Sequence, residues 1–214
     1  MGTDTKVLLL VGGPEYHDTP ETRAALSGLL SRKFDVTMTD DLAVLKPETL
    51  SGYDVIVNFT TFLEPTDEQI GALLDAVAGG KGFVGIHGAT ATFGNSPAYI
   101  GMIGGKLIVH DPNKRFKVNI GTARAVEEHP ITQGVDDFEI QDELYIIEGD
   151  LTQWHILARA EGHPIVYTKM WGKGRVYNNA LGHDVRALSN PGFQTLIING
   201  VEWAAGRFVP MPNA

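Results

Sequence analysis

The sequence predicts an α/β fold whose central sheet is mostly parallel and is covered by helices on both faces. Three observations predict it. Apolar runs recur along the first half of the chain, segments with helical periodicity separate them, and the length suits one core. Parallel strands joined by helices bring their carboxyl ends to one edge of the sheet, where ligands bind in folds of this class. We therefore expect functional residues at that edge.

The first half of the chain alternates strands and helices. Strands are predicted at Lys6–Val11, Phe34–Met38, Tyr53–Phe59 and within Lys81–Thr90. Thr19 and Pro20 mark the start of the first helix, because the hydroxyl can cap it and proline suits its first turn. Thr66 and Gln69 form a capping box for the second helix. Its apolar residues recur at helical spacing and are Ile70, Leu73, Leu74 and Val77.

The second half turns to shorter alternating stretches, which predict mixed or antiparallel strands appended to the parallel core. They are Phe116–Val126, Asp137–Ile147, His155–Ala160, Pro164–Trp171 and Arg175–Leu181. The segment Gly172–Gly174 predicts a hairpin turn between the last two. Ser96 and Pro97 begin a short helix, and a last helix is capped near Asn190. Its apolar face is Phe193, Leu196, Ile197, Gly200, Val201 and Ala204.

The segment Lys81–Thr90 places His87 at the end of an apolar run and directly before small residues. Gly85, Gly88 and Ala89 leave room for a tight strand-to-helix turn, which would place His87 in a cleft. The arrangement G-x-H-x-A has the shape of the G-x-S-x-G nucleophile elbow. A packed strand end without chemistry is the alternative, because such junctions are common in α/β proteins.

Other histidines also follow predicted strands. His17 lies in the loop after the first strand, His110 follows an apolar run, and His183 follows the strand that ends at Leu181. We expect these imidazoles at the same edge of the sheet as the elbow. Each also has a structural interpretation, such as capping of the first helix by His17. His129 precedes proline in a predicted turn and is expected to be structural.

Composition excludes several classes of function. The 214 residues, 43% of them hydrophobic, suit a single domain over residues 1–214. The net charge of −9 disfavours a nucleic-acid partner. The sequence has no cysteine, so disulfides, thiolate metal sites and a cysteine nucleophile are excluded. We expect a soluble, cytoplasmic protein with no membrane partner, since no apolar run is long enough to span a bilayer.

Together these motifs resemble the trehalose-utilisation (ThuA-like) family, which has the class I glutamine amidotransferase-like fold. The matching motifs are His17-Asp18, G-x-H-G-A at 85–89, G-G-x-x-x-x-H at 104–110, His129-Pro-Ile-Thr, Asp142-Glu-Leu-Tyr and G-K-G-R-V-Y-x-x-x-L-G-H ending at His183. They cover residues 7 to 206. The resemblance implies a flavodoxin-like three-layer sandwich with a mostly parallel central sheet, plus short antiparallel strands in the C-terminal half.

The resemblance also implies how the site differs from an amidotransferase. In amidotransferases of this fold the elbow residue is a cysteine that a later histidine activates. Here His87 stands at the elbow and His183 near the activating position, so glutamine hydrolysis by that route is excluded. Two imidazoles activate each other weakly but bind zinc or a similar divalent metal well. We expect His17, His87 and His183 as metal ligands, with His110 or Glu143 as a fourth ligand or as the catalytic base.

Finally, the resemblance implies a small-molecule carbohydrate substrate. The family is associated with the use of trehalose and related disaccharides, next to dehydrogenases that form 3-keto sugars. Such a sugar has an acidified proton on C2, so metal-assisted proton abstraction followed by elimination, hydrolysis or isomerisation is expected. Tyr145 would hydrogen-bond the sugar and Trp171 would stack on it. The alternative is a non-catalytic sugar-binding or regulatory relative, and a homo-oligomer is left open.

Overall fold

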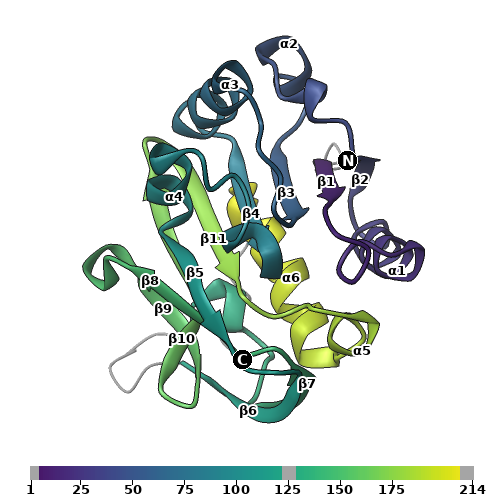
Figure 1. Ribbon diagram of the computed structural model, residues 1–214, viewed down its shortest axis with the longest axis vertical. Coiled ribbons are helices and arrows are strands. Elements are labelled where there is room, and N and C mark those ends of the chain that lie inside the picture. Colours follow the sequence, from purple (N-terminus) through teal and green to yellow (C-terminus); the bar gives the residue numbers. More distant parts are fainter. Residues whose placement is uncertain (1–4, 122–128, 208–214) are drawn as a thin grey trace.

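Across residues 5–121 and 129–207, which the computed structural model describes, nine strands form one mixed sheet (Figure 1). In spatial order they are β2 (Asp35–Thr39), β1 (Lys6–Gly12), β3 (Val55–Thr60), β4 (Gly82–Ile86), β11 (Gly174–Asn179), β10 (His163–Trp171), β9 (His155–Ala160), β6 (Lys114–Ile120) and β7 (Phe138–Asp142). The first five in this order are parallel to one another, and the last four pair antiparallel. The predicted α/β fold is thus confirmed.

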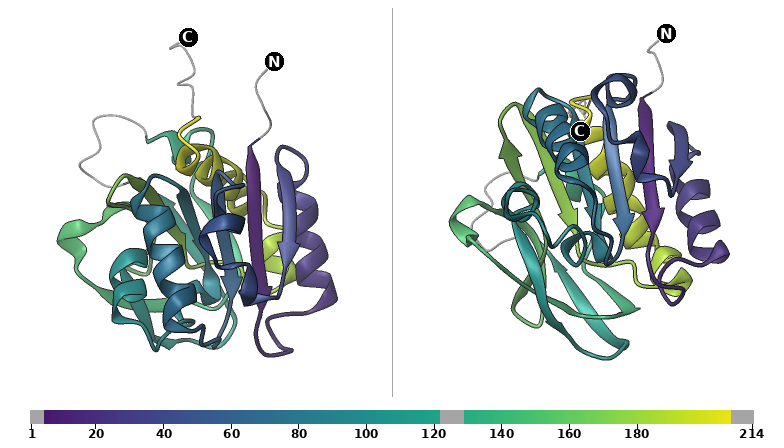
Figure 2. Two further views of the ribbon diagram at one scale, coloured as in Figure 1. Left: turned by 90° about the horizontal axis from the view of Figure 1, so that it is seen from above. Right: turned by 45° about the horizontal axis from the view of Figure 1, so that its top comes forward.

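Helices cover both faces of the parallel strands, and Figure 2 shows the resulting layers. One face packs on α1 (Pro20–Leu30) and α6 (Pro191–Ala204). The other packs on α2 (Pro47–Leu50), α3 (Asp67–Ala78) and α4 (Pro97–Ile103). Strands β1, β3 and β4 are buried almost throughout because they contribute apolar side chains to both layers. No helix in the described part of the chain is long and apolar enough to cross a membrane.

The sequence located the helix starts correctly. The hydroxyls of Thr19, Thr66 and Ser96 each accept a hydrogen bond from the first turn of the following helix. The carboxamide of Asn190 caps α6, and the whole predicted apolar face of that helix is buried. The hairpin between β10 and β11 has the predicted turn, in which Trp171 pairs with Gly174. These features depend on neighbours in sequence, which explains why they could be predicted.

Two predictions about the C-terminal strands need correction. The segment Arg175–Leu181 was expected among the appended strands, but β11 pairs in parallel with β4 inside the core. The stretch Asp137–Ile147 was expected as one strand region, but it divides into β7 in the large sheet and β8 (Tyr145–Gly149) in another. Part of the predicted stretch Phe116–Val126 forms β6, and its residues 122–126 lie outside the described residues.

Strand β8 pairs antiparallel with β5 (Gly105–His110) in a separate two-stranded sheet. In this pair His110 lies opposite Tyr145. The small sheet contacts η2 (His87–Thr90), the 3₁₀ turn that follows β4. It therefore brings residues from the middle of the chain to the carboxyl edge of the parallel strands.

Candidate metal centre

Four side chains from distant parts of the sequence meet at the carboxyl edge of the parallel strands. They are His17 from the loop after β1, His87 directly after β4, His183 after β11, and Glu143 between β7 and β8. One ligand atom from each lies within 4.8 Å of the others. We call these four residues the His/Glu cluster. The cluster includes the three residues predicted as metal ligands, and it could hold a metal ion.

Glu143 lies at the centre of the cluster. Its Oε2 is 3.1 Å from His183 Nδ1, 3.6 Å from His87 Nε2 and 3.9 Å from His17 Nε2. Glu143 Oε2, His87 Nε2 and His183 Nδ1 are nevertheless buried without a hydrogen-bond partner in the described structure. Buried polar atoms left unpaired are costly and rare. A cation bound among them would satisfy all three, so the residues present fit a metal ion.

The backbone of His87 adopts the strained turn that the elbow pattern predicted. Its φ of +45° lies in the left-handed region, which non-glycine residues seldom occupy. Small neighbours are required there, because a Cβ at Gly88 would overlap the hydroxyl of Thr61 and one at Gly85 would lie 2.8 Å from Asn178 Oδ1. The Nδ1–H of His87 donates to the carbonyl oxygen of Ala180 at 3.0 Å. In the neutral ring this leaves the lone pair on Nε2, which faces the cluster.

His17 is held by contacts on its backbone and on its ring. The hydroxyl of Thr22 donates to the carbonyl oxygen of His17 at 2.9 Å, and His17 Nδ1 is 3.1 Å from the hydroxyl of Thr61. Thr19, and not His17, caps α1, so the alternative structural role for His17 is not observed. These contacts orient Nε2 of His17 toward Glu143.

Asp142 ties together the two loops that carry Glu143 and His183. Its fully buried carboxylate accepts hydrogen bonds from the backbone N–H groups of Gly182 at 2.7 Å, Glu143 at 2.8 Å and His183 at 3.1 Å. Burial raises the pKa of the Asp142 carboxyl, and the charge of His87 and the three amide donors oppose that shift. Asp142 thus positions both neighbouring cluster residues through their backbone.

The environment sets the charge of each cluster member. Burial raises the pKa of the Glu143 carboxyl, but its polar contacts with the three imidazoles lower it by more, so Glu143 is ionised. Burial lowers the pKa of the His17 imidazole, and this effect prevails over the attraction of Glu143. For His183 burial also lowers the pKa, but Glu143 and the nearby aspartates raise it by more. The cluster thus combines an ionised carboxylate with two imidazoles of shifted pKa, which is lowered for His17 and raised for His183.

His110 and Tyr145 lie beside the cluster. His110 Nδ1 is 3.5 Å from Glu143 Oε2, and its side chain is 42% exposed. The Nδ1–H of His110 donates to the carbonyl oxygen of Asp111 at 3.1 Å. The ring of Tyr145 lies 4.1 Å from the ring of His87 and 5.5 Å from that of His110, measured between centroids. Both predicted residues are therefore adjacent to the candidate ligands.

The structure does not bring Trp171 to the cluster. Strand β10 runs antiparallel to the core strands, so its last residue, Trp171, pairs with Gly174 at the start of β11. His183 follows the other end of β11, at the opposite edge of the sheet. Trp171 packs instead against the core cluster to which α3 and α4 contribute side chains. Its predicted stacking on a sugar bound at the cluster is not supported by this position.

Sequence reasoning missed Thr61 and the carbonyl group of Ala180. Thr61 contacts Nδ1 of His17 and the Ala180 carbonyl contacts Nδ1 of His87, the ring nitrogens that do not face the cluster. Thr61 directly follows β3, so the strand-end rule that selected the histidines could have found it. The Ala180 carbonyl carries no side-chain signal, and only the pairing of β11 with β4 places it beside His87.

His129 has the structural role that the sequence predicted. Its Nδ1 accepts a hydrogen bond from the backbone N–H of Ile131 at 3.2 Å and caps η3 (Pro130–Thr132). Burial, and the nearby charge of His155, lower the pKa of His129 from 6.5 to about 4. Its ring contacts the rings of His155 and Trp203.

We expect His129→Asn to reduce the loss of stability at acidic pH. The lowered pKa means that the unfolded chain binds a proton more readily, so the unfolding free energy falls as pH drops from 6.5 to about 4. Asparagine can still cap η3 but does not titrate. Urea unfolding at pH 7.5 and pH 5 measures the difference. A variant that loses as much stability as the wild type between these pH values would contradict the prediction.

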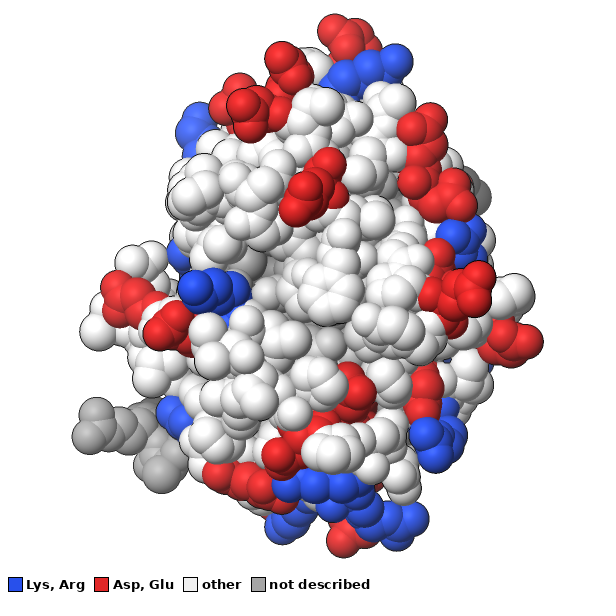
Figure 3. All heavy atoms as spheres, in the orientation of Figure 1, with Lys and Arg blue, Asp and Glu red and all other residues white. Residues whose placement is uncertain are grey.

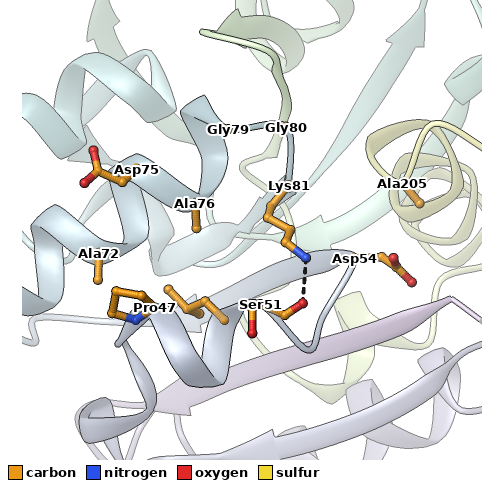
Figure 4. A pocket seen from close by; sticks show the side chains of 11 residues that line it. Pro47, Ser51, Asp54, Ala72, Asp75, Ala76, Gly79, Gly80, Lys81 and Ala205 are labelled. Atoms are coloured by element: carbon orange, nitrogen blue, oxygen red, sulfur yellow. Dashed lines mark hydrogen bonds between the residues drawn. The ribbon is translucent and has the colours of Figure 1, made fainter.

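A separate pocket of about 570 Å³ lies at the other edge of the sheet, between α2, α3 and the start of β4 (Figure 4). Lys81 lies in it, and its ammonium group donates to the carbonyl oxygens of Ser51, at 3.0 Å, and Tyr53. Its cation is therefore already engaged with backbone. None of the predicted site residues lines this pocket.

Comparison with known proteins gives a consistent family and fold. The model of the ThuA family, described as trehalose utilisation, matches residues 6–204. A ThuA-like protein from Parabacteroides merdae has a TM-score of 0.84 at 22% identity, covering 98% of this chain and 93% of that one. A ThuA-like protein from Bacteroides uniformis has a TM-score of 0.78 at 20% identity, covering 94% and 91%.

The amidotransferase likeness is also found. A GMP synthase component from Thermoplasma acidophilum has a TM-score of 0.58 at 13% identity, covering 96% of each chain. At these identities the solved structures show the fold alone, and they confirm the amidotransferase-like fold that the motifs implied. No curated protein sequence matches this chain.

Proposed function

The chain belongs to the ThuA trehalose-utilisation family, and from this premise we propose that it is a metal-dependent enzyme acting on a 3-keto glycoside. The reaction removes the proton on C2 and eliminates the substituent on C1. The proposal depends on one observation. Three imidazoles and one carboxylate converge, several of their buried polar atoms have no hydrogen-bond partner in the described structure, and the partly exposed His110 lies beside them. The family suggests the substrate class and its acidic C2 proton, and the residues supply candidate metal ligands and a candidate base.

His17, His87, His183 and Glu143 would hold the ion. Three imidazoles and one carboxylate are donors that zinc and similar divalent cations accept. When bound, the ion would supply a Lewis acid for the negative charge that develops on the ketone oxygen. Glu143 is assigned as the fourth ligand because its Oε2 lies nearest the centre of the three imidazoles.

His110 is assigned as the base. Its Nδ1–H donates a hydrogen bond to the carbonyl oxygen of Asp111. In this neutral tautomer Nε2 carries the lone pair that can accept the C2 proton. The electrons of the C2–H bond then form a C1=C2 double bond as the bond from C1 to the leaving oxygen breaks. The imidazolium of His110 can return its proton to that oxygen. Addition of water to the unsaturated product would complete a hydrolysis.

Tyr145 is assigned a role in orienting the sugar. Burial, and the charges of Glu143 and Asp142, raise the pKa of the Tyr145 phenol well above its usual value. The hydroxyl therefore stays protonated and can donate to a sugar oxygen. Its ring also packs between His87 and His110 and keeps the base beside the cluster.

Incubation with methyl 3-keto-glucoside and 3-keto-trehalose tests the proposal. Wild-type protein supplied with zinc, manganese or cobalt should consume at least one of them and release the C1 alcohol, which NMR detects. Deuterium on C2 should slow the reaction, because breaking of the C2–H bond contributes to the rate. Unchanged substrate after long incubation, together with calorimetric evidence of sugar binding, would favour the non-catalytic alternative.

A further inference from the structure

A pocket of about 450 Å³ adjoins the His/Glu cluster and is within the size range of small-molecule sites. His110 lines it, and His110 Nδ1 is 3.5 Å from Glu143 Oε2. Thr90 also lines it and ends the turn that begins with His87. His110 and Thr90 thus relate the pocket to the surroundings of the cluster, which makes it a candidate for the part of the substrate beyond C1.

The side chains that line this pocket are mostly apolar. The large ones are Phe62, Ile100, Leu107, Ile108 and Val109. All lining residues are described, and none of them is an acid, an amide or an arginine. Two of the polar groups are already engaged: the hydroxyl of Thr92 accepts from the N–H of Leu63, and Lys106 pairs with Glu148 at 3.8 Å.

Several of these apolar side chains are unusually exposed. Phe62 is 62% exposed, Ile108 54% and Val109 56%. Phe62 also has a φ of +55°, and its N–H donates to the carbonyl oxygen of Ala91. A bulky residue held in a left-handed conformation is typical of functional segments. In Figure 3 the centre of this face is largely uncharged, with a basic group to its left, acidic groups below it and further charges around the rim.

These observations decide between two kinds of C1 substituent. A second sugar ring would bring its hydroxyl groups mainly against side chains that cannot hydrogen-bond them, at a cost for each unpaired group, because polar side chains are a minority of the lining. An aromatic or alkyl group would instead bury its own apolar surface and that of Phe62, Ile108 and Val109. We infer that this pocket binds an apolar aglycone, and that the chain prefers an aryl or alkyl glycoside to a disaccharide. The inference rests on the proposed function, since the group in the pocket is the C1 substituent that leaves.

Binding of unoxidised glucosides tests this preference without turnover, because they lack the 3-keto group that the reaction needs. Calorimetric titration of the wild-type protein compares 4-nitrophenyl glucoside, methyl glucoside and trehalose. The aryl glucoside should bind about tenfold more tightly than methyl glucoside, and trehalose no more tightly than methyl glucoside. Equal affinities for the three, or tighter binding of trehalose than of the aryl glucoside, would overturn the inference.

Variants locate the binding. Phe62→Ala and Ile108→Asn should remove the aryl preference and leave methyl glucoside affinity unchanged. Met170→Asn is a matched control, since Met170 is 53% exposed on β10 and does not line the pocket. An aryl preference that persists in both pocket variants would also overturn the inference. Failure to consume either 3-keto substrate would refute the proposed reaction and leave this binding comparison intact, so the two failures are distinguishable.

Discussion

Protein purified without chelator is expected to carry about one divalent cation per chain, and His87→Ala should remove it. The reason is the convergence of Glu143 Oε2, His87 Nε2 and His183 Nδ1, which are buried without hydrogen-bond partners. Loss of one imidazole removes a direct ligand and leaves three donors, so the affinity should fall by more than about 100-fold. Elemental analysis after gel filtration, followed by titration of the stripped protein with zinc, measures the change.

Three further variants separate metal binding from folding. His183→Ala should behave like His87→Ala at a less buried position. Thr61→Val keeps the shape of the side chain but removes the hydroxyl beside His17 Nδ1, and should weaken binding by about 10- to 100-fold. His163→Ala is the control, because this exposed histidine begins β10 and should leave the metal content unchanged. Wild-type protein that holds no ion and binds none when offered would refute the metal site.

Much of the fold could be predicted because its signals are local. The capping box at Thr66 and the apolar spacing of α3 need only neighbouring residues. Strand pairing is not local in the same way. The hairpin turn after Trp171 predicts that β11 pairs with β10, but nothing near β11 in sequence indicates that its other edge pairs in parallel with β4. That pairing emerges only when the complete core is packed.

In the candidate site, too, some features could be predicted from local sequence signals and others depend on how the strands pair. His17, His87 and His183 follow strands that turned out to be parallel, so the strand-end rule found them. Trp171 ends a strand that runs the other way, and the structure places it at the opposite edge. The sequence left Glu143 and His110 as alternatives for the fourth ligand or the base. Their different positions become visible only in the fold, where Glu143 Oε2 lies among the three imidazoles and His110 lies partly exposed beside them.

The second large effect is expected for His110→Gln, which should lower turnover of a 3-keto glucoside by about 10²- to 10⁴-fold while the metal content stays at the wild-type level. Glutamine is similar in size and polarity but cannot accept the C2 proton. His110 is partly exposed and lies outside the group of four candidate ligands, so its loss should not empty the site. Initial rates by NMR and elemental analysis of the same preparations give the two measurements.

Glu143→Gln is the matched comparison, and it should lose the metal and the turnover together because its carboxylate is central to the cluster. The pair of variants assigns the roles of the two residues: lost turnover with retained metal identifies the base, and loss of both identifies a ligand. If His110→Gln turned over substrate at the wild-type rate while Glu143→Gln kept its metal and lost activity, the assignments would be reversed. The carboxylate would then be the base, and the three histidines alone would hold the ion.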